Sequence, residues 1–356
     1  MEGSEIESLL GSRIVHEELM SKRERIQAII AGEPSDRCGF WLGNPDPGTW
    51  PILHDYFGTS SQRELRRLLG DDFVWVCPEL IGGVYRHPAG RQMFDLEMEK
   101  LRHGQPGPFA HMTDVAQLDG YEWPSLGYLH YEGVLAELRD VGDLYRASGH
   151  WTPFYHDLCF LFGMEEYFVK MYTHPEVVHA ATDRVCQFYY DANELFFQQA
   201  GEMVDGFFFG NDFGTQADLM ISPAKFDEFV MPWFRQFTKQ GHRHGKQVIL
   251  HSCGSVYRVI NRLIDAGVDC LHPLQARAGN MDAETLAREF KGRIAFLGGV
   301  DAQGVLPNGT PAEVRAEVHR VRRLLEPRLI VSPSHEAILP DVPPANVKAM
   351  AEAARE

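Results

Sequence analysis

Eight short apolar or aromatic runs recur along the chain, and most of them end in polar residues or glycine. Near-continuous apolar runs bounded by turn signals are typical of parallel strands that are buried on both faces. The sequence therefore predicts eight strands, at residues 38–44, 72–79, 150–157, 206–212, 247–254, 270–275, 294–301 and 329–335.

Amphipathic stretches of helical length lie between the later strands, and several open with a proline, which is favoured at the first helical position. They are FDEFVMPWFRQFTKQ after Ser222-Pro223, VYRVINRLIDAGV with Gly267 at its end, AEVRAEVHRVRRLL after Thr310-Pro311, and ANVKAMAEAARE after Pro343-Pro344. Strands that alternate with helices predict an α/β fold, and eight strands indicate a (β/α)8 TIM barrel formed by residues 1–356 as a single domain. A doubly wound open sheet is the competing fold, but no glycine-rich fingerprint follows the first strand.

Residues 80–149 fit neither a strand nor a helix pattern and are rich in Gly, Pro and His, as in IGGVYRHPAG and RHGQPGPFAHMTD. We interpret them as an insertion between the second and third strands. Such an insertion would lie at the barrel mouth and form a lid or substrate wall. A solvated surface excursion explains the composition equally well.

Charge and composition narrow the classes of partner. The chain has 34 Lys and Arg against 50 Asp and Glu, a net charge of −16, which disfavours nucleic acid and anionic membranes. The six cysteines are scattered without paired spacing, as expected in a reducing compartment. The N-terminus mixes charges throughout and does not resemble a signal peptide, and no apolar run approaches the ~20 residues that span a bilayer. These features predict a cytoplasmic protein.

Polar and ionisable residues gather where the predicted strands end. Barrel enzymes carry their catalytic groups on the loops that follow the strands, so these residues are candidates for the site, although loops generally begin with polar residues. They are Asn44, Glu79, His156, Asp157, Asn211, Asp212, His251, Cys253, Gln275, Asp301 and His335.

The most specific local pattern is His251-Ser252-Cys253-Gly254. Residues two apart on a strand point to the same side, so His251 and Cys253 can face one point in the mouth. Imidazole nitrogen and thiolate sulfur suit Zn²⁺, and His335 at the end of the last strand is the candidate third ligand. The alternative is a hydrogen-bonded core histidine beside a small buried cysteine.

Several segments resemble the uroporphyrinogen decarboxylase family in its broad sense. They are RIQAIIAGEPSDR, GNDFGTQADLMISPAKFDEFVMPWF, ILHSCGSVYRVINRLIDAGVDCLHPLQ, FLGGVDAQGVLPNGTPAEV and VSPSHEAILPDVPPANVKAM, in order along nearly the whole chain. The resemblance implies a (β/α)8 barrel. It leaves two activities open: cofactor-free decarboxylation, or zinc-dependent transfer of methyl groups between a corrinoid protein and a thiol or other acceptor.

Individual positions favour the methyltransferase branch of this resemblance. The decarboxylases have a Gln-Ala-Gly-Arg stretch after the first strand, where this chain has GFWLGNPDPGTW without an arginine. Their pyrrole-binding aspartate would fall at or near Glu79. The methyltransferases have a His-x-Cys that matches His251 and Cys253. Their third ligand is a cysteine at the position of His335, although the decarboxylases also have a substrate-binding histidine near that point.

The resemblance thus implies a zinc-dependent methyltransferase that transfers a methyl group between a small methylated substrate or thiol and a corrinoid protein. The corrinoid protein would be a separate partner, because the sequence contains no visible corrinoid-binding module. For oligomeric state, a homodimer is one option. We assign metal binding to His251, Cys253 and His335, catalysis to Asp212, Glu79 and His335, and substrate binding to Asn44, His156, Asn211, Gln275 and Asp301.

Two other classes stay open. A metal-free carboxy-lyase acting on another carboxylated substrate would use Arg86, Arg91 and Arg277 as carboxylate partners, although each fits a surface charge as well. A binding protein that kept the barrel and lost catalysis is the non-enzymatic alternative.

Overall fold

Eight parallel strands form the centre of the computed structural model, which describes residues 20–96, 105–335 and 337–356. The strands are β1 (Gly39–Phe40), β2 (Phe73–Val76), β3 (Tyr145–Ser148), β4 (Gly206–Gly210), β5 (Gln247–His251), β6 (Cys270–His272), β7 (Ala295–Val300) and β8 (Leu329–Pro333). Their order is β1-β8-β7-β6-β5-β4-β3-β2, so consecutive strands from β2 to β8 are neighbours, β8 pairs with β1, and β1 and β2 form the two edges. Eight parallel strands in a nearly closed ring confirm the predicted (β/α)8 barrel.

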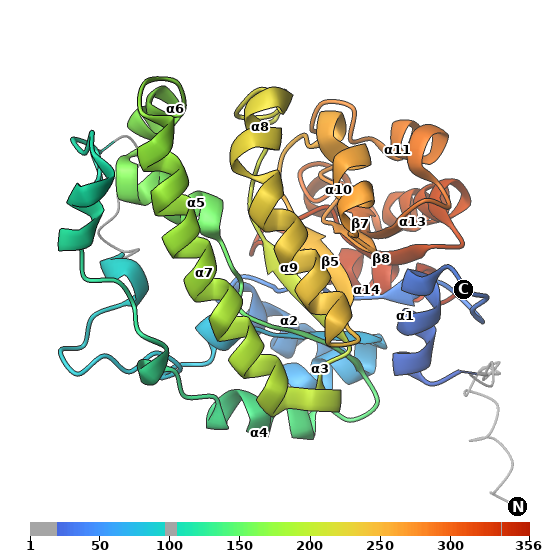
Figure 1. Cartoon of the computed structure of the whole chain (residues 1–356). Helices are drawn as coiled ribbons and strands as arrows, with labels where there is room; N and C mark the ends of the chain where they lie inside the picture. The colour runs from blue at the N-terminus through green and yellow to red at the C-terminus, as the bar shows by residue number, and fades with distance from the viewer. Residues whose placement is uncertain (1–19, 97–104, 336) are drawn as a thin grey trace, which may run out of the picture.

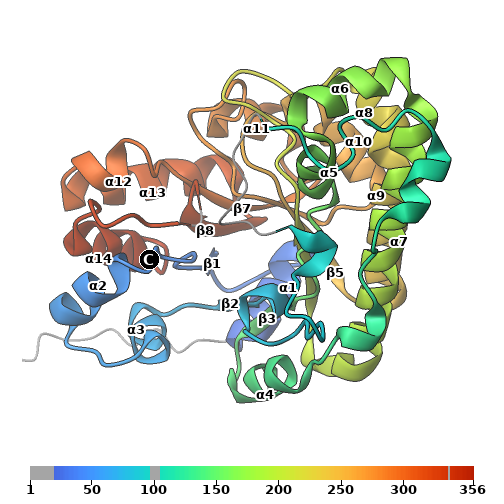
Figure 2. The same cartoon turned by 90° about the vertical axis from the view of Figure 1, so that its left-hand side faces the viewer.

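Helices surround the strands, and the long α7 crosses the face seen in Figure 1 beside α9. Figure 2 shows the strands in the middle of this shell. The helices are α1 (Lys22–Ala31), α2 (Thr49–Phe57), α3 (Gln62–Leu69), α4 (Glu132–Asp140), α5 (Phe154–Phe162), α6 (Met164–Thr173), α7 (Pro175–Ala200), α8 (Pro223–Phe229), α9 (Met231–Arg243), α10 (Ile260–Ala266), α11 (Ala283–Phe290), α12 (Val305–Asn308), α13 (Pro311–Leu325) and α14 (Pro344–Ala353).

The predicted helix starts are confirmed by their caps. Ser222 accepts a hydrogen bond from the amide of Lys225 at the start of α8. Thr310 and Glu313 form a reciprocal capping box at the start of α13, which satisfies two amide groups that the first helical turn leaves unpaired. Gly267 ends α10 in the left-handed conformation, with φ of 100°, as a glycine C-cap does.

Helix α1 closes the N-terminal end of the barrel, because it contacts β1, β2, β3, β7 and β8. Its buried Ile26, Ile29 and Ile30 belong to the same cluster as the inward-facing side chains of the strands. Large aromatic rings, among them Trp41 and Phe208, fill the interior with their centroids 6.1 Å apart. The barrel is therefore a packed core rather than a pore, which leaves the mouth as the place for a site.

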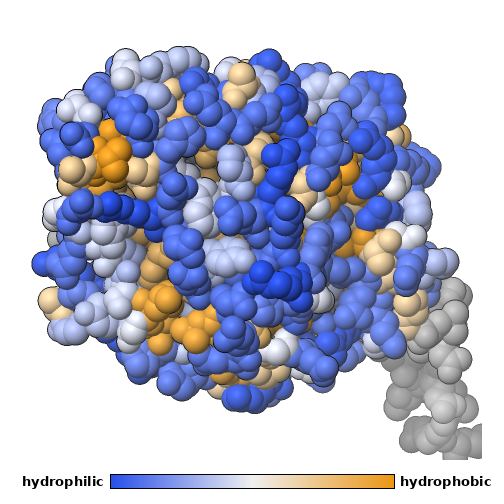
Figure 3. All heavy atoms as spheres, in the orientation of Figure 1, coloured by the Kyte–Doolittle hydropathy of each residue, from blue (hydrophilic) through white to orange (hydrophobic). Residues whose placement is uncertain are grey.

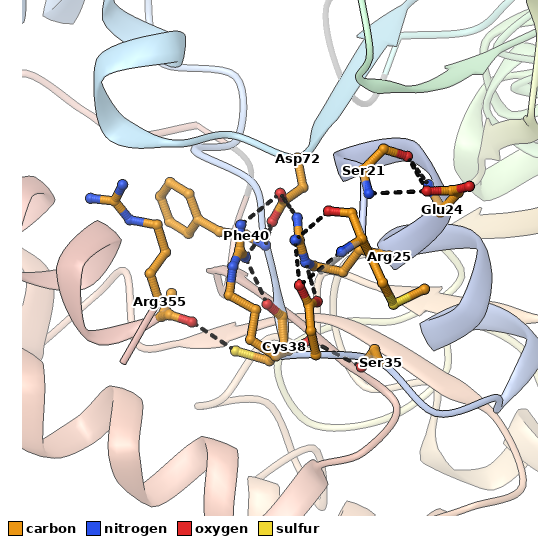
Figure 4. A network of polar contacts seen from close by, with 12 residues as sticks. Ser21, Glu24, Arg25, Ser35, Cys38, Phe40, Asp72 and Arg355 are labelled. Atoms are coloured by element: carbon orange, nitrogen blue, oxygen red, sulfur yellow. Dashed lines mark hydrogen bonds and ion pairs between the residues drawn. The ribbon is translucent and has the colours of Figure 1, made fainter. Parts of the chain in front are cut away.

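A buried carboxylate joins β1 to β2 at the edge of the sheet. Asp72 accepts a hydrogen bond from the backbone amide of Phe40 at 3.0 Å, and its own amide donates to the Phe40 carbonyl at 2.9 Å. Arg25 of α1 and Arg37 bind its two oxygens at 2.7–2.9 Å, and Asp72 is fully buried. Figure 4 shows Arg25, Phe40 and Asp72 turned toward one another. This network holds together the two edge strands and the helix beneath them.

The third predicted strand is wrong. Residues 150–157 form a loop and the first turn of α5, and the strand lies at Tyr145–Ser148, where Tyr145 pairs with Phe73 in parallel register. This strand alternates: Tyr145 and Ala147 pack inside the barrel, whereas Arg146 lies near Asp205 at 3.7 Å. A search for continuous apolar runs misses it and selects instead the aromatic segment around Pro153.

The predicted 80–149 insertion is correspondingly too long, because α4 and β3 are regular elements of the barrel. What remains before α4 includes the short 3₁₀ helices η1 (Pro78–Leu80), η2 (Met93–Asp95), η3 (Val115–Gly120) and η4 (Leu126–Tyr128). η3 and η4 pack against α7, on the left of Figure 1. The described part of the excursion is thus anchored to the barrel's helical shell.

Hydrophilic residues cover most of the face in Figure 3, and hydrophobic residues form small separate patches on it. Among the described helices, none is both long enough and apolar enough to cross a membrane.

Candidate active site

Strand β5 and the loop after it carry the histidine and cysteine of the His-x-Cys pattern. His251 is the last residue of β5 and is 4% exposed, whereas Cys253 is half-buried. The Cys253 Sγ lies 3.3 Å from the His251 Nε2, so the two side chains converge as predicted. Gly254 turns the chain with φ of 76° where a Cβ would lie 2.4 Å from the Gly214 backbone, so this turn requires glycine.

A carboxylate from the neighbouring strand completes the cluster. Asp212 follows β4, and its Oδ1 lies 3.3 Å from the His251 Nε2 and accepts a hydrogen bond from the Cys253 amide at 2.8 Å. One ligand atom from each of these three residues lies within 4.8 Å of the others. Atoms roughly 2.0–2.3 Å from a tetrahedral zinc ion are about 3.3–3.7 Å apart, so the two 3.3 Å separations suit a shared ion.

The groups around Asp212 stabilise the negative charge of its carboxylate. Burial raises the pKa of this carboxyl, but the hydrogen bond and charge of His251, the charge of His156 and the Cys253 amide together lower it below its ordinary value. The His156 Nε2, from the first turn of α5, lies 3.6 Å from the Asp212 Oδ2. Asp212 is therefore an anionic oxygen donor at neutral pH, and His156 reaches the site although it does not follow a strand.

Two further aromatic side chains enclose His251. The ring of Trp151 lies 5.1 Å from the His251 ring, centroid to centroid. His272 at the end of β6 places its Nδ1 2.9 Å from the His251 Nδ1. Burial lowers the pKa of His272 well below its ordinary value, and the charges of His251 and His335 lower it further.

His335 lies in the turn after β8, and its Nδ1 accepts a hydrogen bond from the Ala337 amide at 3.2 Å. The charge of His335 contributes to the lowered pKa of His272, after burial and the charge of His251. Within the described residues, the cluster of mutually close ligand atoms contains Asp212, His251 and Cys253 without His335. The role of His335 as a ligand stays a prediction.

Glu79 belongs to a second, buried set of polar groups. Its Oε1 lies 2.7 Å from the Nδ1 of His150, a residue with no exposed surface, and its Oε2 accepts from the Trp151 amide at 3.2 Å. The His150 Nε2 in turn lies 2.7 Å from the hydroxyl of Tyr131, which donates to the Ala192 carbonyl at 3.1 Å. Glu79, His150 and Tyr131 thus form a series of hydrogen bonds beside Trp151, whose ring lies next to His251.

The hydrogen bonds of Tyr131 and Glu79, at the two ends of this series, determine which atoms carry the protons. Because the Tyr131 hydroxyl donates to a carbonyl, its oxygen accepts a hydrogen bond from the His150 Nε2–H. The His150 Nδ1 and Glu79 then share one proton across 2.7 Å. Burial raises the pKa of Glu79, but the charge and hydrogen bond of His150 and the Cys77 thiol lower it below its ordinary value, which favours an ionised Glu79.

Three of the predicted substrate-binding residues hold loops in place. The buried Asn211 accepts from the Tyr155 amide at 2.8 Å and donates to the Thr152 carbonyl at 3.0 Å. Gln275 accepts from the Gly254 amide at 2.6 Å. Asp301 accepts from the Gln303 and Gly304 amides, at 2.9 and 3.1 Å, in the turn before α12.

Asn44 has a different position from the cluster. It lines a cavity of about 460 Å³ whose other walls include residues of α3, α4 and β2. Asn44 is half-buried there, and Asp71 and Trp75 line the same cavity. A substrate contact by Asn44 therefore stays a prediction.

Sequence reasoning missed His150, Trp151 and His272. His150 and Trp151 stand in the aromatic run that was interpreted as a strand, so their place in the turn after β3 was hidden. The predicted sixth strand extended to Gln275, whereas β6 ends at His272. The end of β6 could have been predicted from the His272-Pro273 step, since proline seldom continues a central strand.

Asp157 of α5 gives a pH-dependent prediction for stability. This buried carboxyl accepts a hydrogen bond from the Tyr189 hydroxyl at 2.7 Å, and burial raises its pKa from 3.8 to about 7 despite that bond. The folded chain thus binds this proton more tightly than the unfolded chain. Its contribution is full below pH 4 and is lost as the pH rises to 7, a change of about 4 kcal/mol at most.

We expect Asp157→Asn to remove this pH dependence and to be more stable than the wild type at pH 8, by about 2 kcal/mol. Urea unfolding of both proteins between pH 4 and 8 measures the difference, and Asp55→Asn at an exposed position is the control. A constant difference between Asp157→Asn and wild type across this range would contradict the prediction.

A (β/α)8 barrel with a histidine, a cysteine and an aspartate converging at the strand ends defines the class of this protein. Residues 157–356 match the profile of the family described as "Uroporphyrinogen decarboxylase (URO-D)". The chain belongs to this family.

Among solved structures, the chain is similar to a "methyltransferase from Methanosarcina mazei", with a TM-score of 0.67 and 18% sequence identity over 94% of this chain and 98% of that one. At this identity the likeness establishes the shared fold. No curated protein sequence matches the chain.

Proposed function

We propose that this protein is a zinc-dependent methyltransferase that moves a methyl group between a small methylated substrate or thiol and a separate corrinoid protein. The observation that carries the proposal is the convergence of the Asp212 carboxylate, the His251 Nε2 and the Cys253 Sγ within 4.8 Å. Nitrogen, sulfur and oxygen donors together suit Zn²⁺ better than a hard cation, which prefers oxygen alone. The name of the structural neighbour is consistent with methyl transfer.

Zinc bound by these residues would supply a positive charge that lowers the pKa of a thiol acceptor or polarises an oxygen of the methyl donor. His251 and Cys253 would hold it from a rigid strand end, and Asp212 would add a negatively charged oxygen. The Trp151 ring restricts the approach to His251 from one side. His156 would orient the Asp212 carboxylate across their 3.6 Å separation.

Glu79 and His150 would serve proton transfer in this proposal. Their shared proton lies beside Trp151, whose amide donates to Glu79 at 3.2 Å. A group that can accept a proton near the metal site is needed when a thiol acceptor is deprotonated. The corrinoid would arrive on a partner protein that docks at the mouth.

The alternative activity, a carboxy-lyase, requires cations for substrate carboxylates. Each of the three candidate arginines already pairs with an acidic side chain of the chain itself. Arg91 lies 2.6 Å from Glu122, and Arg277 lies 2.9 Å from Asp301. Arg86 lies 3.7 Å from Glu132. These pairings favour the methyltransferase over the lyase.

Metal analysis of untagged protein tests the proposal. We expect roughly one zinc ion per chain in the wild type and loss of most of it in Cys253→Ala, since a site with three protein ligands loses its sulfur donor. Cys159→Ala, which removes a buried cysteine of α5, is the matched control and should keep its zinc. Methyl transfer from methylated thiols or amines to a free corrinoid should be lost in parallel.

The other outcomes identify the competing functions. A folded, zinc-free wild type that releases CO₂ from a carboxylated substrate would replace the proposal with the lyase. A folded protein with neither zinc nor turnover would indicate a binding protein. Retention of zinc in Cys253→Ala would show that the metal sits elsewhere.

A further inference from the structure

Two buried histidines meet at the base of the candidate metal site. His251 and His272 are direct partners in the parallel pairing of β5 and β6, and they are 4% and 0% exposed. Their Nδ1 atoms are 2.9 Å apart, a hydrogen-bond distance. The Ser252 amide also donates to the His272 carbonyl at 2.9 Å, so the backbone fixes the pair.

A hydrogen bond between two imidazole nitrogens needs one proton between them, and this restricts the pair to two arrangements. In the first, the His251 Nδ1 carries the proton and donates to His272, so the lone pair of the His251 Nε2 is available. In the second, His272 donates to the His251 Nδ1, and the His251 proton sits on Nε2, facing Asp212 at 3.3 Å. Both arrangements contain two protons, so they are tautomers of the same neutral pair.

His272 lies in the aromatic core of the barrel. Its ring is enclosed by Trp41 and Phe208, with centroid distances of 5.4 and 5.3 Å. Its Nε2 is buried and has no hydrogen-bond partner among the residues that the structure describes. A buried polar atom of this kind costs about 1–3 kcal/mol, so an apolar ring at this position would suit the core better.

We propose that His272 is a positioning residue for the metal site: its Nδ1 accepts a hydrogen bond from the His251 Nδ1–H, so the His251 Nε2 lone pair is available to a metal ion held together with Asp212 and Cys253. The inference rests on the proposed function and deepens it. A group that hydrogen-bonds the second nitrogen of a ligating histidine fixes its tautomer and orientation, and losing such a group weakens metal binding by about 10–100-fold.

Two substitutions separate the hydrogen bond from the packing. His272→Phe keeps an aromatic ring and removes the acceptor, whereas His272→Asn places a side-chain oxygen where the Nδ1 was. Phe208→Leu is the packing control, because it loosens the contact with the His272 ring and leaves the acceptor in place. Each full-length protein is titrated with Zn²⁺ against a chromophoric chelator and with Co²⁺, whose thiolate charge-transfer band reports Cys253, and its melting temperature is recorded.

We expect His272→Phe to bind Zn²⁺ about 10–100-fold more weakly, while His272→Asn stays within about threefold of the wild type. Phe208→Leu should lower the melting temperature without changing zinc affinity. Equal affinity of His272→Phe and wild type, or equal losses in His272→Phe and His272→Asn, would overturn the positioning role and leave the proposed function intact. A wild type that binds neither Zn²⁺ nor Co²⁺ would overturn both.

A measurement on the wild type covers the case in which His272→Phe does not fold. In ¹⁵N spectra of the zinc-loaded protein, labelled at histidine, the His251 Nδ1 should carry a hydrogen-bonded proton. Coordination of the metal through the His251 Nδ1 would overturn the inference.

Discussion

An Asp212→Asn variant is expected to bind Zn²⁺ about 100-fold more weakly than the wild type. The substitution keeps an oxygen that can accept the Cys253 amide, so the loop after β5 stays in place. It removes the negative charge that lies 3.3 Å from the His251 Nε2. Structural zinc sites bind with about 10–16 kcal/mol over four ligands, so one ligand contributes roughly 3 kcal/mol, a factor of about 100.

His335→Ala is the companion variant, because the family resemblance assigns the third ligand to His335. The geometry favours Asp212, which lies in the cluster with His251 and Cys253. Chelator competition for Zn²⁺ on both variants decides between the two residues, and we expect the larger loss in Asp212→Asn. The reverse order would make His335 the ligand and Asp212 a support for the Cys253 loop.

The second large effect is expected at the edge of the sheet. Asp72→Asn should lower the free energy of unfolding by about 3–5 kcal/mol, because it leaves the buried guanidinium groups of Arg25 and Arg37 without the carboxylate between them. The asparagine oxygen can still accept the Phe40 amide, so the change isolates the loss of charge. Urea unfolding monitored by circular dichroism measures it.

Asp140→Asn is the matched control, since Asp140 also pairs with an arginine, Arg63, but is 71% exposed. Exposed pairs contribute little, so this variant should unfold at nearly the wild-type urea concentration. Similar midpoints for Asp72→Asn and Asp140→Asn would mean that the packing of α1, rather than the ion pairs, joins β1 to β2.

β4 is a strand that the sequence predicted correctly, and both of its faces are buried. In β4, every residue of Gly206–Gly210 is buried, and the run GFFFG stands out from its neighbours. β3 could not be found in the same way, because only Tyr145 and Ala147 face the interior and Arg146 lies outside. The prediction failed where alternation replaced a continuous apolar run.

His251 and Cys253 were predictable for a local reason: residues two apart on a strand share a side, whatever the rest of the chain does. The helix starts at Ser222 and Thr310 are local in the same sense, because a cap satisfies amides within its own first turn. The sequence by itself therefore determined the class of fold, the position of most of its elements and two of the three residues of the candidate metal site.

Only the tertiary structure decided which other side chains lie beside His251 and Cys253. Asp212 and His272 lie 39 and 21 positions from His251, respectively, by subtraction of their residue numbers. The parallel register places Gly210 and His272 beside His251 and so brings the loop after β4 to the same point. Contacts of this kind depend on how the barrel closes, and spacing along the chain does not encode that closure.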